Sequence, residues 1–135
     1  MSKKSGKFSF ELLDACIMNG FETITRIGGY VILFNILAQM LKEFGGSSGI
    51  IKAIGMGLLE ITTGISQLCS LNIDNKTKIV LTAALSSFGG LSGIAQTKSV
   101  LQDSGLSISS YLAVKLLHAL LAGIISLLYV FAGNY

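Results

Sequence analysis

Apolar residues follow one another along most of this chain, in stretches that a soluble domain could not bury. The stretch 107–132 has no polar side chain from 119 to 125, and it is long enough to cross a bilayer, since a spanning helix needs about 20 residues. A second apolar stretch, 26–43, closes on Lys42 and Glu43. The pattern therefore predicts spanning helices over 107–132 and 26–43.

The segment before the first span has a different pattern. Residues 8–21 combine apolar side chains with acidic ones at roughly helical spacing, which is typical of an amphipathic helix at the membrane surface. Arg26 follows, and we expect it to anchor the span at the interface and to pair with Glu22 one helical turn earlier. The sequence thus predicts an N-terminal interfacial helix, separate from the span after Arg26.

The middle of the chain alternates apolar helices with glycine-rich or polar turns. A turn over 45–49 precedes a predicted helix over 50–70, whose hydrophobicity is interrupted near its centre, and a polar turn over 72–76 follows. Two half-helices, 78–87 and 92–102, come next. The pattern leaves two arrangements open for these half-helices. They could cross the bilayer together as one broken helix, or the second could return as a hairpin.

Gly89 and Gly90 are the predicted structural hinge between these half-helices. The chain has no proline, so breaks in its helices depend on glycine. A break at membrane depth leaves backbone groups without partners, and such groups are tolerated only where protein buries them or a wet cavity receives them. The hinge is therefore the local feature that points most directly to a functional site.

Composition supports an all-α membrane protein. Hydrophobic residues make up 51% of the 135 residues and charged residues 13%, with a mean hydropathy of +0.70. We predict a polar basic tail over 1–7 and a single membrane domain over 8–135. This domain is a bundle of about four transmembrane or half-membrane helices, with a glycine-broken helix and the N-terminal interfacial helix. Its apolar surface makes the lipid bilayer its first partner.

The charged and reactive residues narrow the function classes. Three lysines before the first apolar segment favour a cytoplasmic N-terminus. The other basic residues are scattered, so we expect no nucleic-acid partner. Two distant cysteines and a single histidine indicate no metal site, and no catalytic motif is present, so we expect neither an enzyme nor a cofactor.

Glu60 is the first candidate site residue. On a continuous helix over 50–70, Glu60, Thr63 and Gln67 share one face, near the middle of the bilayer. A carboxylate there costs about 2.5 to 3.5 kcal/mol on insertion scales, so it usually faces a cavity or a partner. We predict that these three residues bind substrate and that Glu60 relays protons; a buried ion pair or a packing role is the alternative.

The second candidate group begins just after the glycine hinge. Ser92 and Gln96 share a side of the second half-helix, and Thr97 lies beside them. The N-terminus of a half-helix offers amide donors to a solute, so we predict substrate binding by these three residues. A close-packed helix interface is the alternative.

His118 is the candidate proton relay on the last helix. It shares a face with Lys115 and Tyr111, and its unperturbed pKa is near 6.5. A histidine that only packs, with one satisfied nitrogen, is the alternative. Lys115 is expected to extend toward the nearer membrane interface.

Four segments together resemble a known family. The segments 27–34 (IGGYVILF), 57–64 (GLLEITTG), 88–96 (FGGLSGIAQ) and 115–119 (KLLHA) are similar to the gate-domain superfamily of nucleoside and ferrous-iron transporters. Within it, the chain most resembles the sporulation integral membrane protein family of spore-forming bacteria, over about residues 8–130.

This resemblance implies a carrier in the bacterial cell membrane, built from two gate halves with discontinuous helices and a solute site between them. It implies small solutes moved during spore formation, with dipicolinate as the cargo class and nucleoside-like molecules as the superfamily's wider range. Only one gate-like half is present here, so the resemblance implies a homo-oligomer or a second gate-like half as partner. A non-transporting membrane scaffold is the alternative.

Overall fold

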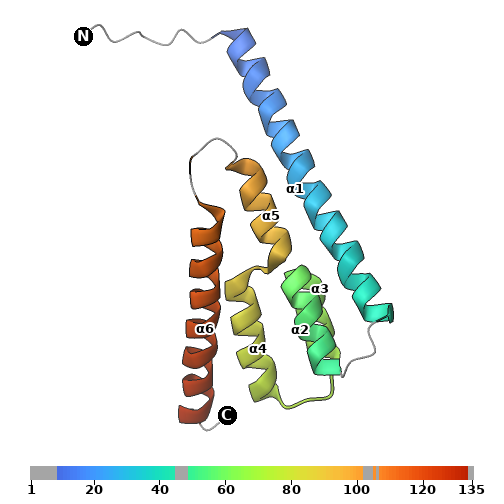
Figure 1. Cartoon of the computed structure of the whole chain (residues 1–135), viewed down its shortest axis with the longest axis vertical. Coiled ribbons are helices and arrows are strands. Elements are labelled where there is room, and N and C mark those ends of the chain that lie inside the picture. Colours follow the sequence, from blue (N-terminus) through green and yellow to red (C-terminus); the bar gives the residue numbers. More distant parts are fainter. Residues whose placement is uncertain (1–8, 45–48, 102–104, 106, 134–135) are drawn as a thin grey trace, which may run out of the picture.

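The computed structural model describes residues 9–44, 49–101, 105 and 107–133, and in this part of the chain it contains helices and no β-strand. The all-α prediction is confirmed. Six helices follow one another in Figure 1: α1 (Phe10–Phe44), α2 (Gly49–Leu59), α3 (Ile61–Ser70), α4 (Asn75–Phe88), α5 (Gly90–Val100) and α6 (Ile108–Ala132).

Three segments are long and apolar enough to cross a membrane. They are α1, the consecutive helices α4 and α5 over Asn75–Val100, and α6. α6 packs along α4 and leaves its outer face exposed, where Leu120, Ile125 and Phe131 keep 61%, 64% and 75% of their surface accessible. A water-soluble protein would bury such side chains, so these surfaces fit a lipid environment.

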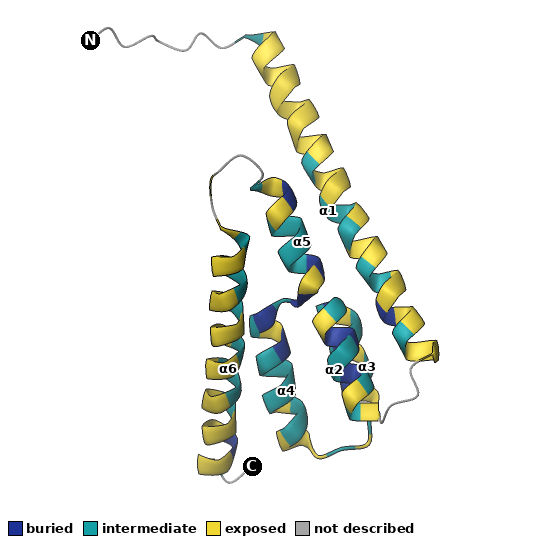
Figure 2. Ribbon diagram, viewed as in Figure 1, coloured by how far each residue is buried: buried dark blue, intermediate teal, exposed yellow. Residues whose placement is uncertain are grey.

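The first helix differs from the prediction. α1 is a single helix of 35 residues, about 52 Å long, and does not divide at Arg26 into an interfacial helix and a span. The predicted ion pair between Arg26 and Glu22 is present, and it lies within the continuous helix. No proline interrupts the chain around Arg26, and polar side chains can stay in a helix, so the change in polarity at this point does not end α1. Its N-terminal half is largely exposed and extends past the other helices (Figures 1 and 2).

The predicted continuous helix over 50–70 is also wrong. The chain turns back at Glu60, and α2 and α3 form an antiparallel hairpin. Near the turn the backbones touch, because a Cβ atom on Gly64 would lie 2.1 Å from the Cα of Gly57. At the open end, a Cβ on Gly49 would lie 2.9 Å from the side chain of Leu71. The hairpin therefore returns to the end of the molecule from which it starts.

The predicted glycine hinge is confirmed. α4 ends and α5 begins at Gly89, with φ of 81° at Gly89 and 71° at Gly90, and left-handed values of this kind favour glycine. The Gly89 amide donates to the carbonyl of Leu85 at 3.0 Å, which closes α4 as an αL cap. α5 continues away from α4 in Figure 1, so this segment is a broken spanning helix and not a returning hairpin.

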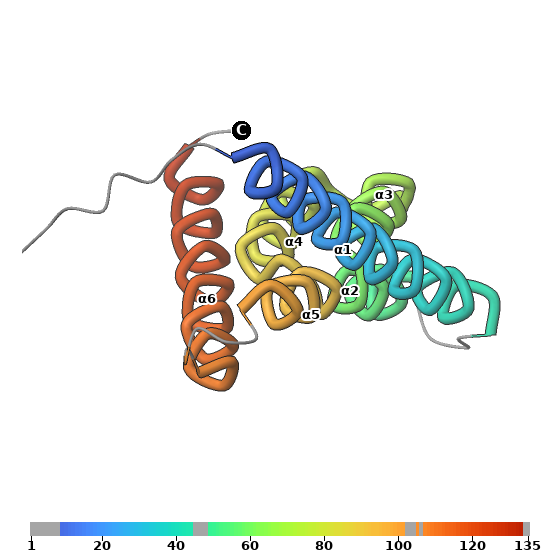
Figure 3. Tube along the Cα trace, turned by 90° about the horizontal axis from the view of Figure 1, so that it is seen from above, coloured from blue at the N-terminus to red at the C-terminus, as the bar shows by residue number. Residues whose placement is uncertain are grey.

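The two helix breaks meet inside the bundle. A Cβ on Gly90 would lie 3.3 Å from the carbonyl oxygen of Leu59 and 3.4 Å from the amide nitrogen of Ile61. We call this meeting of the Glu60 turn with the glycine hinge the crossing. Buried Leu85 and Phe88 pack beside it, and Figure 3 shows α4 and α5 between α6 on one side and α1 on the other. The crossing lies near the middle of the Asn75–Val100 span.

Candidate functional site

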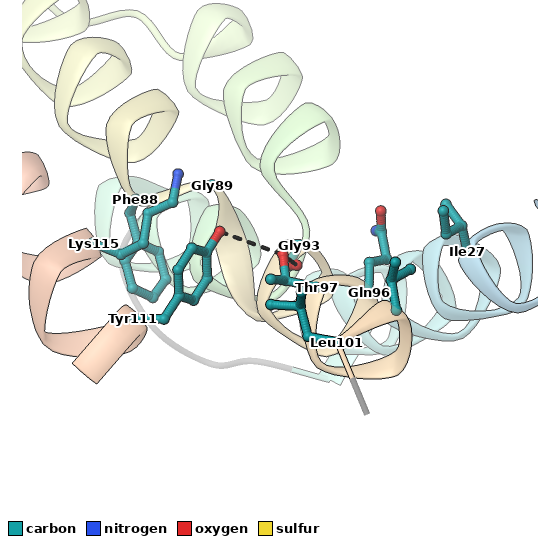
Figure 4. Close-up of a pocket in the computed structure, with 10 residues that line it drawn as sticks. Ile27, Phe88, Gly89, Gly93, Gln96, Thr97, Leu101, Tyr111 and Lys115 are labelled. Carbon is teal, nitrogen blue, oxygen red and sulfur yellow. Dashed lines mark hydrogen bonds between the residues drawn. The ribbon is translucent and has the colours of Figure 1, made fainter. Parts of the chain in front are cut away.

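A groove of about 480 Å³ runs along α5 from the glycine hinge to the C-terminal end of that helix. Its lining comes from four elements that are separate in the sequence (Figure 4). They contribute Ile27 from α1, Phe88 and Gly89 at the end of α4, Gly93, Gln96, Thr97, Val100 and Leu101 along α5, and Tyr111 and Lys115 from α6. We call it the α5 groove.

Two of the three site residues predicted on α5 line this groove. Gln96 and Thr97 do so, whereas Ser92 is buried and keeps only 3% of its surface accessible. Ser92 is coupled to the groove through Gln96, whose Nε2 donates to the Ser92 Oγ at 2.8 Å. The Thr97 hydroxyl donates to the carbonyl of Gly93 at 2.8 Å. Ser92 therefore orients Gln96 and does not itself face a solute in this groove.

Lys115 lies differently from its prediction. Its side chain turns inward to the glycine hinge and not toward the interface: a Cβ on Gly89 would lie 3.6 Å from the Lys115 Nζ. The same ammonium lies 5.8 Å from the centre of the Tyr111 ring. The helical spacing of Lys115 and Tyr111 already placed them on one face of α6. The contact of Lys115 with the glycine hinge depends on the tertiary packing of α6, which the sequence does not show.

Glu60 is buried, with 5% of its surface accessible, and its carboxylate caps α3. Oε2 accepts hydrogen bonds from the hydroxyls of Thr62 and Thr63, both at 2.7 Å, and from the Thr63 amide at 2.8 Å. Oε1 accepts from the Thr62 amide at 3.2 Å. A carboxylate with this many donors satisfies the first turn of α3, which would otherwise leave amides without partners at membrane depth.

A second groove, of about 360 Å³, follows α3 along its whole length. Thr63 and Gln67, both predicted site residues, line it together with Thr62, Ser66 and Ser70 of α3, Met56 of α2, and Gln39 and Lys42 of α1. We call it the α3 groove. Its polar lining begins at Thr62 and Thr63, which donate to the capping carboxylate of Glu60, and ends at Ser70, where the hairpin opens.

Four of the predicted site residues divide between two grooves, with Thr63 and Gln67 in the α3 groove and Gln96 and Thr97 in the α5 groove. Glu60 and Gln96 share no groove, because Gln96 lines the α5 groove, while Glu60 lines neither groove and directs its carboxylate to its own helix. The chain turn at Glu60 separates the two groups, whereas the prediction assumed a straight helix through that residue. His118 is exposed on α6 and lines neither groove.

Metal-binding and disulfide chemistry find no support in the described part of the chain. No group of three or more histidine, cysteine or acidic side chains that could hold a metal ion occurs there. Cys16 and Cys69 are both free and exposed.

The fold and the grooves define an α-helical membrane protein with three candidate spans, one returning hairpin and a broken helix against the hairpin's turn. Comparison with protein-family models found no match, and comparisons with curated proteins and with solved structures found none either. The arrangement of the chain therefore carries the functional argument.

Proposed function

We propose that this chain is half of a membrane carrier that moves a small solute, a dipicolinate-like anion or a nucleoside-like molecule, across a bacterial membrane during sporulation. The crossing of two helix breaks is the observation that carries the proposal. Non-helical backbone at membrane depth is tolerated where it lines a water-filled cavity or is buried in protein, and transporters use broken helices of this kind to bind solutes at mid-depth.

The two grooves support a carrier more than a rigid scaffold. The α3 groove leads from the open end of the hairpin to Thr62 and Thr63 beside the crossing, and the α5 groove leads from Gly89 to Leu101 at the far end of α5. The two grooves thus follow α3 and α5, which extend from the crossing toward opposite ends of the molecule (Figure 1). A carrier that opens alternately to either side needs access routes in this arrangement.

A partner completes the proposed carrier. Both grooves are open on one side, and the hydroxyl-bearing face of α3 includes exposed Thr62 and Ser66. Polar side chains at this depth are costly against hydrocarbon, so they need a covering surface. A second copy of the chain or a related gate-like half would supply it, with the N-terminus on the cytoplasmic side as the three early lysines favour.

Uptake into proteoliposomes tests the carrier. Radiolabelled dipicolinate or uridine should enter liposomes containing the purified protein faster than protein-free liposomes. Gly93→Leu should lower this uptake at least about tenfold, because a Cβ at Gly93 meets no atom within 4 Å and the added side chain would fill the α5 groove. Gly29→Leu is the matched control, since Gly29 has equal space and lines neither groove.

Two results would favour the scaffold instead. One is uptake of both solutes at the rate of protein-free liposomes. The other is equal uptake by the Gly93→Leu and Gly29→Leu variants, because a solute that passes through the α5 groove could not ignore a side chain that blocks it.

A further inference from the structure

The α5 groove contains a positive charge whose partner the described chain does not supply. Lys115 is the one charged side chain of its lining. Within the described residues, Arg26 and Glu22 form an ion pair. No carboxylate oxygen of these residues lies within 4.0 Å of the Lys115 ammonium. This ammonium lies over the Tyr111 ring, 5.8 Å from the ring centre. A half-buried charge at this depth calls for a counter-charge.

The position of Lys115 explains how its charge is stabilised in the α5 groove. The ammonium lies at the glycine hinge, where the last carbonyls of α4 favour a cation and the first amides of α5 favour an anion. The helix end carries only a partial negative charge, so it stabilises the ammonium without neutralising it. Lys115 is therefore poised for an anion that reaches the hinge through the groove.

The remaining lining describes the body of that anion. The Thr97 hydroxyl donates to the Gly93 carbonyl at 2.8 Å and, in a longer contact of 3.4 Å, to the Tyr111 hydroxyl oxygen. Because the Tyr111 oxygen is the acceptor in this contact, the Tyr111 hydrogen can be donated to a ligand. Around these groups the walls are apolar, formed by Phe88, Val100 and Leu101. The space of about 480 Å³ suits a small molecule of compact shape.

We propose that the α5 groove binds a small organic carboxylate, with the carboxylate on the Lys115 ammonium and the Tyr111 hydroxyl and its apolar body against Phe88 and Leu101. The inference rests on the proposed carrier function, and within it assigns the charge of the solute to one residue. A solute with a neutral head would leave the ammonium unpaired, so the groove discriminates by charge.

Fluorine NMR titration of the protein in phosphatidylcholine nanodiscs tests this assignment. Fluorobenzoate and fluorobenzamide are the probes, since they share size and shape and differ in charge. Fluorobenzoate should bind at least about tenfold more tightly than fluorobenzamide, the effect expected of a charge-assisted hydrogen bond. Lys115→Met should remove this preference, and Lys115→Arg should largely keep it.

Lys98→Met is the matched control, because Lys98 is an exposed lysine of α5 that does not line the groove. It should bind fluorobenzoate as the unmodified chain does. The proposal is overturned if no saturable fluorobenzoate binding is found, if both probes bind alike, or if Lys115→Met keeps the preference. If Lys115→Met does not fold, the comparison of the two probes on the unmodified chain and on Lys115→Arg still decides.

Three further outcomes distinguish this inference from lipid binding and from the proposed carrier function. If phosphatidylglycerol in the nanodisc abolishes fluorobenzoate binding, the groove takes a lipid headgroup and the solute assignment fails. Uptake by the liposomes that does not depend on Lys115 refutes the assignment and leaves the carrier. Conversely, Lys115-dependent fluorobenzoate binding without any uptake refutes the carrier and leaves the binding groove.

Discussion

At the Glu60 turn a side chain caps the helix that follows, whereas at the glycine hinge the backbone caps the helix that precedes it. Glu60 has φ of −142° and ψ of 120°, ordinary extended values, and its carboxylate accepts four hydrogen bonds from Thr62 and Thr63. Gly89 and Gly90 instead have positive φ, and α5 begins without a side-chain cap. At the Glu60 turn the first amides of α3 are hydrogen-bonded by the Glu60 carboxylate. At the glycine hinge the ends of α4 and α5 lie beside Lys115 and the α5 groove and have no side-chain cap.

This difference indicates separate roles for the two breaks. A saturated carboxylate that caps a buried helix contributes mainly to the stability of the hairpin. The uncapped start of α5, beside the α5 groove and Lys115, is the part that can respond to a ligand. Substitutions at the first break should therefore change folding, and substitutions around the second should change both folding and binding.

The largest expected effect concerns the hairpin that holds the Glu60 turn in place. In Gly64→Ala the new Cβ would lie 2.1 Å from the backbone of Gly57, and neither backbone can move away without separating α2 from α3. We expect a loss of about 3 kcal/mol or more in the free energy of unfolding, measured by titration with SDS in mixed micelles. Gly93→Ala, with no atom within 4 Å, is the control and should be neutral or stabilising by up to about 1 kcal/mol. Equal losses in both variants would show that the hairpin is not closed as described.

The next effect measures the contact between the two breaks. Gly90→Ala and Gly105→Ala place alanine at nearly the same left-handed φ, 71° and 70°, which costs about 1–2 kcal/mol in each. Only at Gly90 does the added Cβ also press on Leu59 and Ile61, at 3.3 and 3.4 Å. Gly90→Ala should therefore lose about 1 kcal/mol more than Gly105→Ala in the same titration. Equal losses would mean that the hinge does not touch the Glu60 turn.

A smaller loss is expected from Glu60→Gln, which keeps the shape of the side chain and replaces one acceptor oxygen by a donor. The amide cannot accept all four hydrogen bonds, so the unfolding free energy should fall by about 1–3 kcal/mol. Glu43→Gln, at an exposed acid near the end of α1, should change it by less than about 0.5 kcal/mol. Full stability of Glu60→Gln would remove the capping role and return the carboxylate to the proton relay predicted from the sequence.

The smallest effect contrasts the buried cap with an exposed one. Asp74 caps α4, and hydrogen bonds from the Thr77 hydroxyl at 2.5 Å and the Thr77 amide at 2.8 Å lower the pKa of its carboxyl below the ordinary value. Since the folded pKa is the lower one, Asp74 adds stability above its unfolded pKa, and this contribution is lost as the pH falls through the folded value. Thermal unfolding from about pH 6 down to about pH 3 should show this decline in the unmodified chain and a weaker one in Asp74→Asn. An identical decline in the variant would assign it to other carboxylates.

The sequence predicted the glycine hinge and missed the turn at Glu60, for related reasons. Adjacent glycines weaken a helix wherever they occur, so Gly89 and Gly90 could be identified locally. Around Glu60 the polar residues keep helical spacing on both sides of the turn. Their positions are therefore the same as those expected for one face of a straight helix. The missed signal was an acidic residue followed three positions later by threonine, as in Glu60 and Thr63, which Asp74 and Thr77 repeat at the start of α4.

The remaining differences come from tertiary structure. Continuity of α1 through Arg26 could not be inferred from the change in polarity there, because a helix can leave the membrane without ending. The inward position of Lys115 depends on how α6 packs along α4, which brings the Lys115 ammonium to the hinge. Residue types and spacing identified Gln96 and Thr97 as groove residues, but the separation of Glu60 from Gln96 needed the fold.

The returning hairpin also determines whether the chain passes from one end of the molecule to the other an odd or an even number of times. The three candidate spans, α1, α4 with α5, and α6, each run from one end of the molecule to the other, and the hairpin returns to the end from which it starts. The number of end-to-end passes is therefore odd, and the two ends of the described chain lie at opposite ends of the molecule (Figure 1). If the chain is half of a carrier, as proposed, a related half fused to its C-terminal side would be inverted, as in transporters with inverted repeats. A separate copy inserted by the same charges would instead share its orientation and pair about a twofold axis along the membrane normal. In the first assembly the two α5 grooves would face opposite compartments, and in the second they would face the same one.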